Sequence, residues 1–154
     1  MKARVAAMTL ALCFLGAVVC FAQSSFMGSW TLNEAKSKFS PSSGKITKAV
    51  WETAGENVKL TTDGVDANGA PTHTEWTGKM NGRYYPISGS SLADTMSLTR
   101  AGSRTLVIRQ KKGKRLTLFG RIVVSADGKT RTVTVHGTGA AGKKFHSMAV
   151  YDKE

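Results

Sequence analysis

Turn signals recur at nearly regular intervals along most of this 154-residue chain. Asn-Gly and Asp-Gly pairs are strong hairpin signals, because a type I′ turn needs positive φ at both central residues. They occur at Asn68-Gly69, Asn81-Gly82 and Asp127-Gly128, and further glycine breaks fall at Gly55, Gly102, Gly113 and Gly142. This spacing restricts the chain to short antiparallel strands joined by tight turns, as in an all-β barrel or sandwich.

The segments between the turns are rich in Thr, Val, Leu and aromatic residues, which favour strands. We expect ten strands, at residues 28–32, 46–53, 58–62, 72–80, 83–86, 95–100, 105–111, 115–124, 130–137 and 144–152. The one long connection, residues 33–45, is expected to hold a helical turn at residues 34–38 before Pro41. The short hairpins imply that neighbours pair in sequence order, which predicts an antiparallel up-and-down β-barrel of about 8–10 strands.

Two strands show their faces by alternation. Residues 130–137 place Arg131, Val133 and Val135 on one face and Thr132, Thr134 and His136 on the other. Residues 115–124 place on one face Leu116, Leu118, Gly120, Ile122 and Val124. The opposite face of that strand also keeps apolar groups, as expected where a wall separates a core from a cavity.

Residues 1–22 have the three zones of a secretory signal peptide, with Lys2 and Arg4 before an apolar stretch and a small-x-small site ending at Ala22. The apolar stretch is short for a membrane span, which needs about 20 residues. A lipid anchor at Cys20 would require a small residue immediately before it, and Val19 is there. We therefore expect a free periplasmic or secreted protein, with residues 23–154 forming a single domain.

Both cysteines, Cys13 and Cys20, lie in the signal segment, so the expected domain has no disulfide. With Lys2 and Arg4 removed it carries 20 Lys+Arg against 10 Asp+Glu, a net charge of +10. That charge favours either solubility alone or attraction to anionic partners. The densest basic run is Lys111, Lys112, Lys114 and Arg115, which either keeps a hairpin tip solvated or contacts an anionic membrane surface.

The two ends of the domain carry a resemblance. Near its start stands Phe26-Met27-Gly28-Ser29-Trp30, and its last residues include Val150-Tyr151-Asp152-Lys153. A Gly-x-Trp opening, a serial meander and such a closing strand resemble the calycin superfamily of lipocalins and fatty-acid-binding proteins, here as a bacterial exported lipocalin-like domain. The resemblance implies a ligand-binding barrel whose end is closed by Gly28 and Trp30.

In the fatty-acid-binding proteins a tyrosine of the closing strand and an arginine two residues earlier hold the ligand carboxylate. Tyr151 matches the tyrosine, whereas Ala149 stands at the arginine position, so the clamp is incomplete. The helical lid of that family is also missing, because residues 33–45 are too few and too rich in Ser and Gly.

Six residues are candidates for ligand binding inside such a barrel. Tyr151 with one inward arginine would make a polar anchor, since a guanidinium binds carboxylates bidentately. Trp51 and Trp76 either pack in the core or line a cavity wall. The candidates are Tyr151, Arg131, Arg121, Arg109, Trp76 and Trp51, and the arginines could equally face solvent.

Other motifs give no site. His73, His136 and His146 lack ligand spacing and cysteine partners, so we expect no metal. Residues 137–142 match Gly-x-Gly-x-x-Gly, but a strand and not a helix follows them, so we expect no nucleotide cofactor. No aromatic series accompanies the basic run, which argues against nucleic acid.

The leading hypothesis is therefore a monomeric exported barrel that binds a small hydrophobic or amphipathic molecule, anionic ones included. The alternative is a filled barrel whose basic exterior contacts anionic envelope components or a partner protein. We expect no enzymatic activity, because no acid/base pair or nucleophile motif is found; a barrel enzyme would need such a pair in its cavity.

Overall fold

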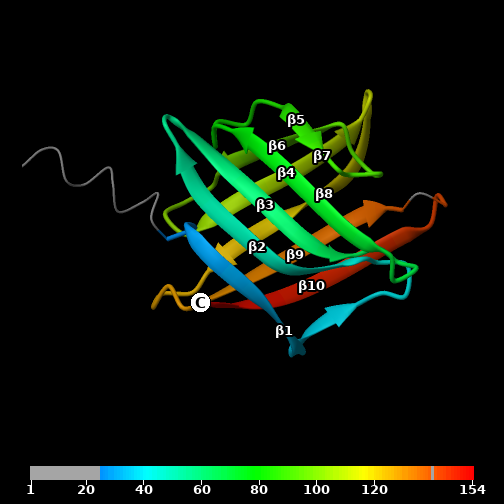
Figure 1. The fold of residues 1–154 in the computed structure, drawn as a ribbon, viewed down its shortest axis with the longest axis horizontal. Coiled ribbons are helices and arrows are strands. Elements are labelled where there is room, and N and C mark those ends of the chain that lie inside the picture. Colours follow the sequence, from blue (N-terminus) through cyan, green and yellow to red (C-terminus); the bar gives the residue numbers. More distant parts are fainter. Residues whose placement is uncertain (1–24, 140) are drawn as a thin grey trace, which may run out of the picture.

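The computed structural model describes residues 25–139 and 141–154. The predicted signal peptide therefore lies outside the described residues. Every regular element in the described part is a strand, and the ten strands form a closed antiparallel barrel (Figure 1). No helix in this part is long and apolar enough to cross a membrane. The predicted all-β up-and-down barrel is confirmed.

The strand bounds follow the turn signals closely, except in β1 and β5. They are β1 (Gly28–Phe39), β2 (Lys45–Ala54), β3 (Asn57–Val65), β4 (Pro71–Gly78), β5 (Tyr85–Ser88), β6 (Thr95–Arg100), β7 (Thr105–Lys112), β8 (Arg115–Val124), β9 (Thr130–Thr138) and β10 (Lys144–Lys153).

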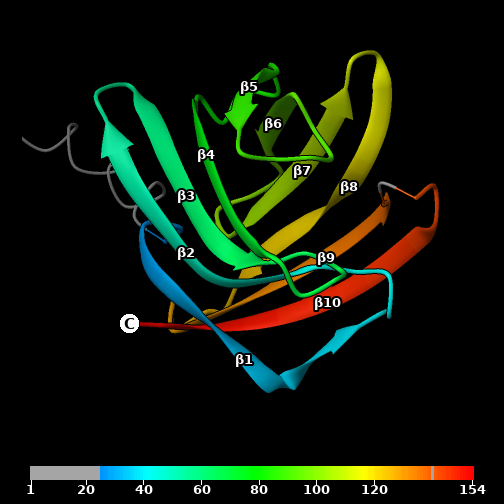
Figure 2. The same ribbon diagram turned by 45° about the vertical axis from the view of Figure 1, so that its right-hand side comes forward.

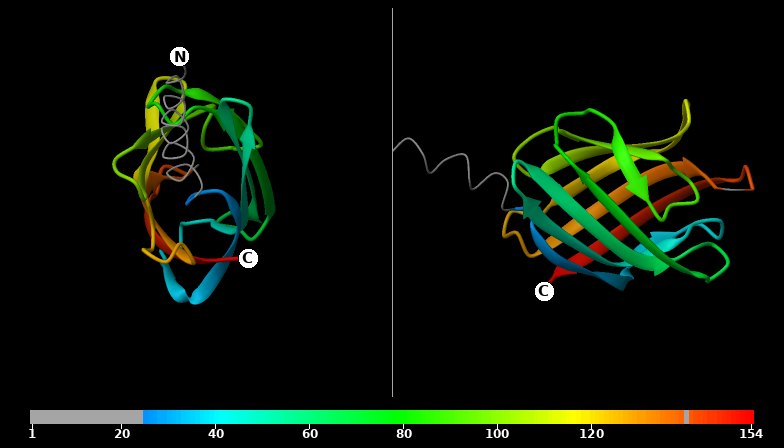
Figure 3. Two further views of the ribbon diagram at one scale, coloured as in Figure 1. Left: turned by 90° about the vertical axis from the view of Figure 1, so that its left-hand side faces the viewer. Right: turned by 45° about the horizontal axis from the view of Figure 1, so that its top comes forward.

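Each strand pairs with its neighbours in sequence, and β1 closes the ring by pairing with both β10 and β2. The end-on view in Figure 3 shows the resulting ring. Most seams are long, but β5 shares only two residue pairs with β4 and two with β6. The wall is therefore held by the fewest backbone bonds at β5.

One end of the barrel is filled by large buried side chains. Phe26 and Trp30 are fully buried there, and Trp51 and Trp76 are buried almost as completely. The indole N–H groups of Trp30 and Trp76 donate to the carbonyl oxygens of Phe26 and Met96, both at 3.0 Å. Buried indoles need such partners. We call this filled region the plug, and Trp30, the residue expected at the barrel end, lies in it.

The predicted helical turn at residues 34–38 is wrong. These residues belong to β1, which bends sharply in the middle (Figure 2). Asn33 pairs with Val150 and Lys38 with Met148, so residues 34–37 bulge opposite the single residue Ala149. The Ser37 hydroxyl donates to the Asn33 carbonyl at 2.7 Å and accepts from the Val150 N–H at 2.9 Å. These bonds stabilise an irregular strand where sequence spacing favoured a helix.

The predicted faces of β9 are confirmed, whereas Leu116 in β8 was placed on the wrong face. A bulge opposite β7 pairs Lys111 with Leu116 and Gln110 with Leu118, which leaves Thr117 as the extra residue. Thr117 is buried and its hydroxyl donates to the Gln110 carbonyl, while Leu116 is 47% exposed. The inward series of β8 thus begins at Leu118.

Gly120 in β8 is required by a close backbone approach. A Cβ at this position would lie 2.1 Å from the Thr134 carbonyl oxygen of β9. We therefore expect Gly120→Ala to lower the free energy of unfolding by about 1–3 kcal/mol, as overpacking does. Gly128 is the control: its φ is +72° but nothing lies within 4 Å of a Cβ. Gly128→Ala should cost only about 1 kcal/mol. Denaturant unfolding checks both, and equal losses would contradict this packing argument.

Candidate ligand cavity

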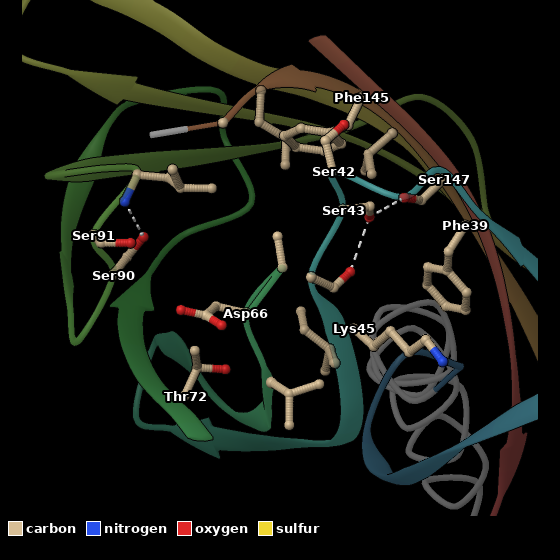
Figure 4. Close-up of a pocket in the computed structure, with 18 of the residues that line it drawn as sticks. Phe39, Ser42, Ser43, Lys45, Asp66, Thr72, Ser90, Ser91, Phe145 and Ser147 are labelled. Carbon is tan, nitrogen blue, oxygen red and sulfur yellow. Dashed lines mark hydrogen bonds between the residues drawn. The ribbon is translucent and has the colours of Figure 1, made fainter. Parts of the chain in front are cut away.

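Above the plug the barrel is hollow. A cavity of about 770 Å³ extends to the open end, where the connections β1–β2, β3–β4, β5–β6 and β9–β10 surround its mouth (Figure 4). Apolar side chains form most of its wall. They are Phe39, Ile46, Val65, Ile87, Leu92, Ile108, Leu118, Val133, Val135, Phe145 and Ala149.

Tyr151 lines the deep part of this cavity, and the plug lies behind it. The residue is 3% exposed, and its hydroxyl donates to the Ile46 carbonyl oxygen at 3.0 Å. That carbonyl lies beside a register shift between Ile46 and Lys48 in the β2–β3 pairing. Burial raises the pKa of Tyr151 to about 12. The floor of the cavity is therefore a neutral phenol whose hydroxyl is already bonded.

Arg131 is buried in the plug, beneath Tyr151. Its guanidinium carbon lies 4.8 Å from the ring centres of both Trp30 and Tyr151 and 5.5 Å from that of Trp51. Its Nε and Nη1 have no hydrogen-bond partner among the described residues. Burial lowers the pKa of Arg131 to about 10, and the aromatic faces supply the compensating attraction. Arg131 is absent from the cavity lining, so Tyr151 separates it from a ligand.

The remaining predicted site residues lie elsewhere. Arg109 and Arg121 are exposed, on the outward faces of β7 and β8, and do not line the cavity. Trp51 and Trp76 are packed in the plug, again outside the lining. Gly28 begins β1 at the closed end with φ +103°. Of the six candidate ligand-binding residues, the structure places only Tyr151 on the cavity surface.

The uncharged polar groups of the cavity were not predicted from the sequence. The hydroxyls of Thr62 and Thr74 are bonded to each other at 2.6 Å across β3 and β4. Ser147 bonds the hydroxyl of Ser43 near the mouth, as Figure 4 shows. Gln110 faces inward from β7, and its amide nitrogen lies 3.6 Å from the sulfur of Met96. Strand alternation could have indicated that Gln110 faces inward, because it follows the inward residues Leu106 and Ile108 at a spacing of two.

Charged groups lie only at the mouth of the cavity, within its described lining. Lys45 is paired with Glu34 at 3.4 Å and lies 5.4 Å from the ring centre of Phe39. The carboxylate of Asp66 accepts from two backbone N–H groups of its own turn, those of Asn68 and Ala70. Lys143 is exposed and makes no side-chain bond with the described residues. It is therefore the mouth cation that remains available to a ligand.

The basic run at the β7–β8 hairpin is partly occupied by intramolecular contacts. Lys112 pairs with Asp94 at 2.9 Å, and the Lys111 ammonium lies 4.1 Å from the ring centre of Tyr84. Lys112 and the Gly113 N–H together hold the pKa of Asp94 below its usual value. Lys114 and Arg115 have no ion pair within the described residues and remain exposed beside Leu116.

We expect Tyr151→Phe to change the alkaline stability of the protein. The pKa of Tyr151 is about 12 in the folded protein and 10 in the unfolded chain. Its contribution to stability is therefore complete below pH 10 and is lost as the pH rises to about 12. Between these values the wild type should lose about 2–3 kcal/mol more stability than the variant. At neutral pH the free energy of unfolding of the variant should be lower by about 0.5–1.5 kcal/mol, because the hydrogen bond to the Ile46 carbonyl is lost.

Urea unfolding at a series of pH values measures this difference, and Arg131 is present in both proteins. Tyr84→Phe is the control, because Tyr84 is 36% exposed. Parallel pH curves for wild type and Tyr151→Phe would contradict the assignment of Tyr151 as a buried, neutral floor.

Comparison with known proteins finds similar solved structures. No family model matches the chain, and no curated protein matches it significantly. The structure of EF1p2_mFAP2b bound to DFHBI matches with a TM-score of 0.49 and 13% identity, over 87% of this chain and 98% of that chain. The redesigned β-barrel mFAP1, bound to DFHBI, matches with a TM-score of 0.45 and 13% identity, over 86% of this chain and 99% of that chain. Likeness at this level carries no argument about function. The chain is an all-β protein that forms a closed ten-stranded antiparallel barrel.

Proposed function

We propose that the barrel binds a small, largely apolar molecule inside its cavity. The observation that carries this proposal is the cavity itself, about 770 Å³ of mainly apolar wall above a closed floor. Small-molecule sites in proteins have volumes of about 300–1,000 Å³ and combine apolar walls with a few polar groups. Thr62, Thr74 and Gln110 supply such groups here. The alternative of a filled barrel does not fit the part between the plug and the open end, which is hollow.

The distribution of charge favours one orientation for an amphipathic ligand. Burying a carboxylate without a charged partner is costly, and Arg131 lies behind Tyr151 and outside the lining. An anionic headgroup would therefore stay at the mouth beside Lys143, with the apolar part directed toward Tyr151. This orientation differs from the inward carboxylate clamp of fatty-acid-binding proteins.

The wider assignment is part of the same proposal. The terminal motifs and the barrel support a lipocalin-like member of the calycin superfamily. The signal-like residues 1–22 support export, which N-terminal sequencing of the product would test by finding Gln23 first. We propose a monomeric binding protein and not an enzyme. The titratable groups in the described lining are Lys45, Asp66, Lys143 and Tyr151. All of them except Lys143 have an intramolecular partner, so they do not form an acid/base pair with one another.

Competition with a fluorescent apolar probe tests this function. Delipidated protein should take up the probe, and a long-chain alcohol and the acid of equal chain length should both displace it. Lys143→Gln should weaken the acid by about two- to fivefold, the range for an exposed ion pair, and leave the alcohol unchanged. Lys129→Gln, in an exposed turn at the closed end, is the matched control. Absence of probe uptake would overturn the proposal, and an equal effect of both substitutions would overturn the orientation.

A second candidate function, contact with an anionic membrane, is favoured by one surface feature. Leu116 is 47% exposed beside Lys114 and Arg115, close to the open end. We expect binding to phosphatidylserine-containing vesicles and not to neutral ones, weakening with salt because exposed charges are screened over about 10 Å at 0.1 M. Substituting both Lys114 and Arg115 with glutamine should reduce that binding. Salt-insensitive binding would exclude this mode.

A further inference from the structure

Two histidines face each other on the outer wall of the barrel. His136 of β9 and His146 of β10 are directly opposite in the strand register, and both are exposed. Phe119 of β8 is opposite His136 in turn, so three rings form one row across three strands. The row borders an outer groove of about 620 Å³ that Ser40, Leu116 and Lys144 also line.

The two imidazoles approach through their nitrogen edges. Their Nδ1 atoms are 3.2 Å apart, whereas the ring centres are 4.4 Å apart with planes inclined by 36°. Since the nitrogens are closer together than the ring centres, the edges that carry Nδ1 converge.

This separation suits two ligands of one metal ion. Zinc binds histidine nitrogen at about 2.0–2.1 Å, which places two nitrogens about 2.9 Å apart at a right angle and about 3.4 Å apart at the tetrahedral angle. The observed 3.2 Å lies between these values. Imidazole ligands suit zinc, copper, nickel and related ions, whereas magnesium and calcium prefer oxygen.

The surrounding strands hold the pair in position. Phe119 stacks on His136 with ring centres 5.2 Å apart and an angle of 18°. The backbone of His146 is bonded on its other side to Ser40, whose N–H donates to the His146 carbonyl at 3.1 Å and whose hydroxyl accepts from the His146 N–H at 3.2 Å. The pair is therefore fixed on paired strands and not on a loop.

We propose that His136 and His146 form a bidentate site for a divalent transition metal of the zinc, cobalt and nickel class. No cluster of three or more His, Cys, Asp or Glu suited to a metal occurs in the described part of the chain. Water therefore fills the remaining coordination positions, and the ion is exchangeable. The site lies on the outer wall, and neither histidine lines the cavity.

Titration of the full chain with Co²⁺, followed by visible absorption and calorimetry, tests this site. We expect one ion per chain, displaced by Zn²⁺. His136→Gln and His146→Gln should each weaken binding by at least about tenfold, since even indirect supports of a metal ligand contribute about 10–100-fold. His73→Gln is the matched control, because His73 is exposed and faces Asp63 at 2.6 Å on another part of the wall.

Three outcomes would overturn the site: no Co²⁺ uptake by the wild type, undiminished uptake in the double variant, or an equal loss in His73→Gln. The pair would then be only a hydrogen bond between the two imidazoles. Circular dichroism of each variant checks that the barrel is intact, and uptake of the apolar probe by the double variant shows that the cavity is unaffected.

Discussion

Replacing Trp30 with alanine should remove about 3–5 kcal/mol from the free energy of unfolding, the range for a fully buried tryptophan. Trp30 has no exposed surface. Its indole N–H donates to the Phe26 carbonyl, and its ring lies 4.8 Å from the guanidinium carbon of Arg131. The substitution removes one of the three tryptophans of the plug and an aromatic face that compensates a buried charge. An uncompensated buried charge is strongly destabilising.

Urea unfolding followed by circular dichroism measures this loss. Phe119→Ala is the control, because Phe119 is an aromatic residue on the outer face and is 51% exposed. Its effect should stay below about 1.5 kcal/mol, because the ring is half exposed and its main aromatic contact is the stacking on His136. If Trp30→Ala does not fold, Trp30→Phe keeps a ring over Arg131 and should give a smaller, measurable loss. A loss below about 1 kcal/mol in Trp30→Ala would show that the plug does not depend on this residue.

Ala149→Phe should weaken uptake of an apolar probe by roughly 10- to 100-fold, a free-energy cost of about 1.4–2.7 kcal/mol. Ala149 lies on the cavity surface two residues before Tyr151 on β10, so a phenyl ring there would occupy the space above the floor. The cavity offers that ring room, and we expect the stability cost to stay within the about 1–3 kcal/mol of overpacking.

Val150→Phe provides the matched control for this substitution. Val150 is the next residue on the same strand and is absent from the cavity lining, so the same ring is added outside the cavity. Probe affinity in Val150→Phe should equal that of the wild type. Equal probe affinity in wild type and Ala149→Phe, with both proteins folded, would place the bound probe outside the cavity.

Local sequence signals were sufficient for most of the barrel. Asn68-Gly69 and Asp127-Gly128 mark real turns, because positive φ at glycine is a property of the turn itself. The bend in β1 depends on residues far away: Ser37 is held by the Val150 N–H, and no local pattern contains that contact. The exposure of Leu116 likewise depends on where the β7–β8 register shifts.

The candidate site was harder to predict than the fold, for a related reason. Alternation groups Arg131 with Val133 and Val135 on one face of β9, but it left open whether that face is the inner one, which the burial of Arg131 shows. It does not say how deep each inward residue lies, because depth is set by the stagger of all ten strands. Arg131 therefore falls in the plug and Val133, two residues later, in the cavity. Alternation could have excluded Arg109, which follows the buried residue Ile108.

The short strand β5 has a consequence for how the barrel moves. Two residue pairs on each side hold it, against the longer ladders of the other seams, so separating β5 from β4 or β6 breaks few backbone bonds. Local openings of a native protein occur first where such bonds are fewest. Ile87 of β5 lines the cavity, so an opening there would connect the interior to solvent through the side of the barrel. A bulky ligand could then enter through the side of the barrel. In hydrogen–deuterium exchange, the amides of β5 and of the residues paired with it should exchange fastest among the strands.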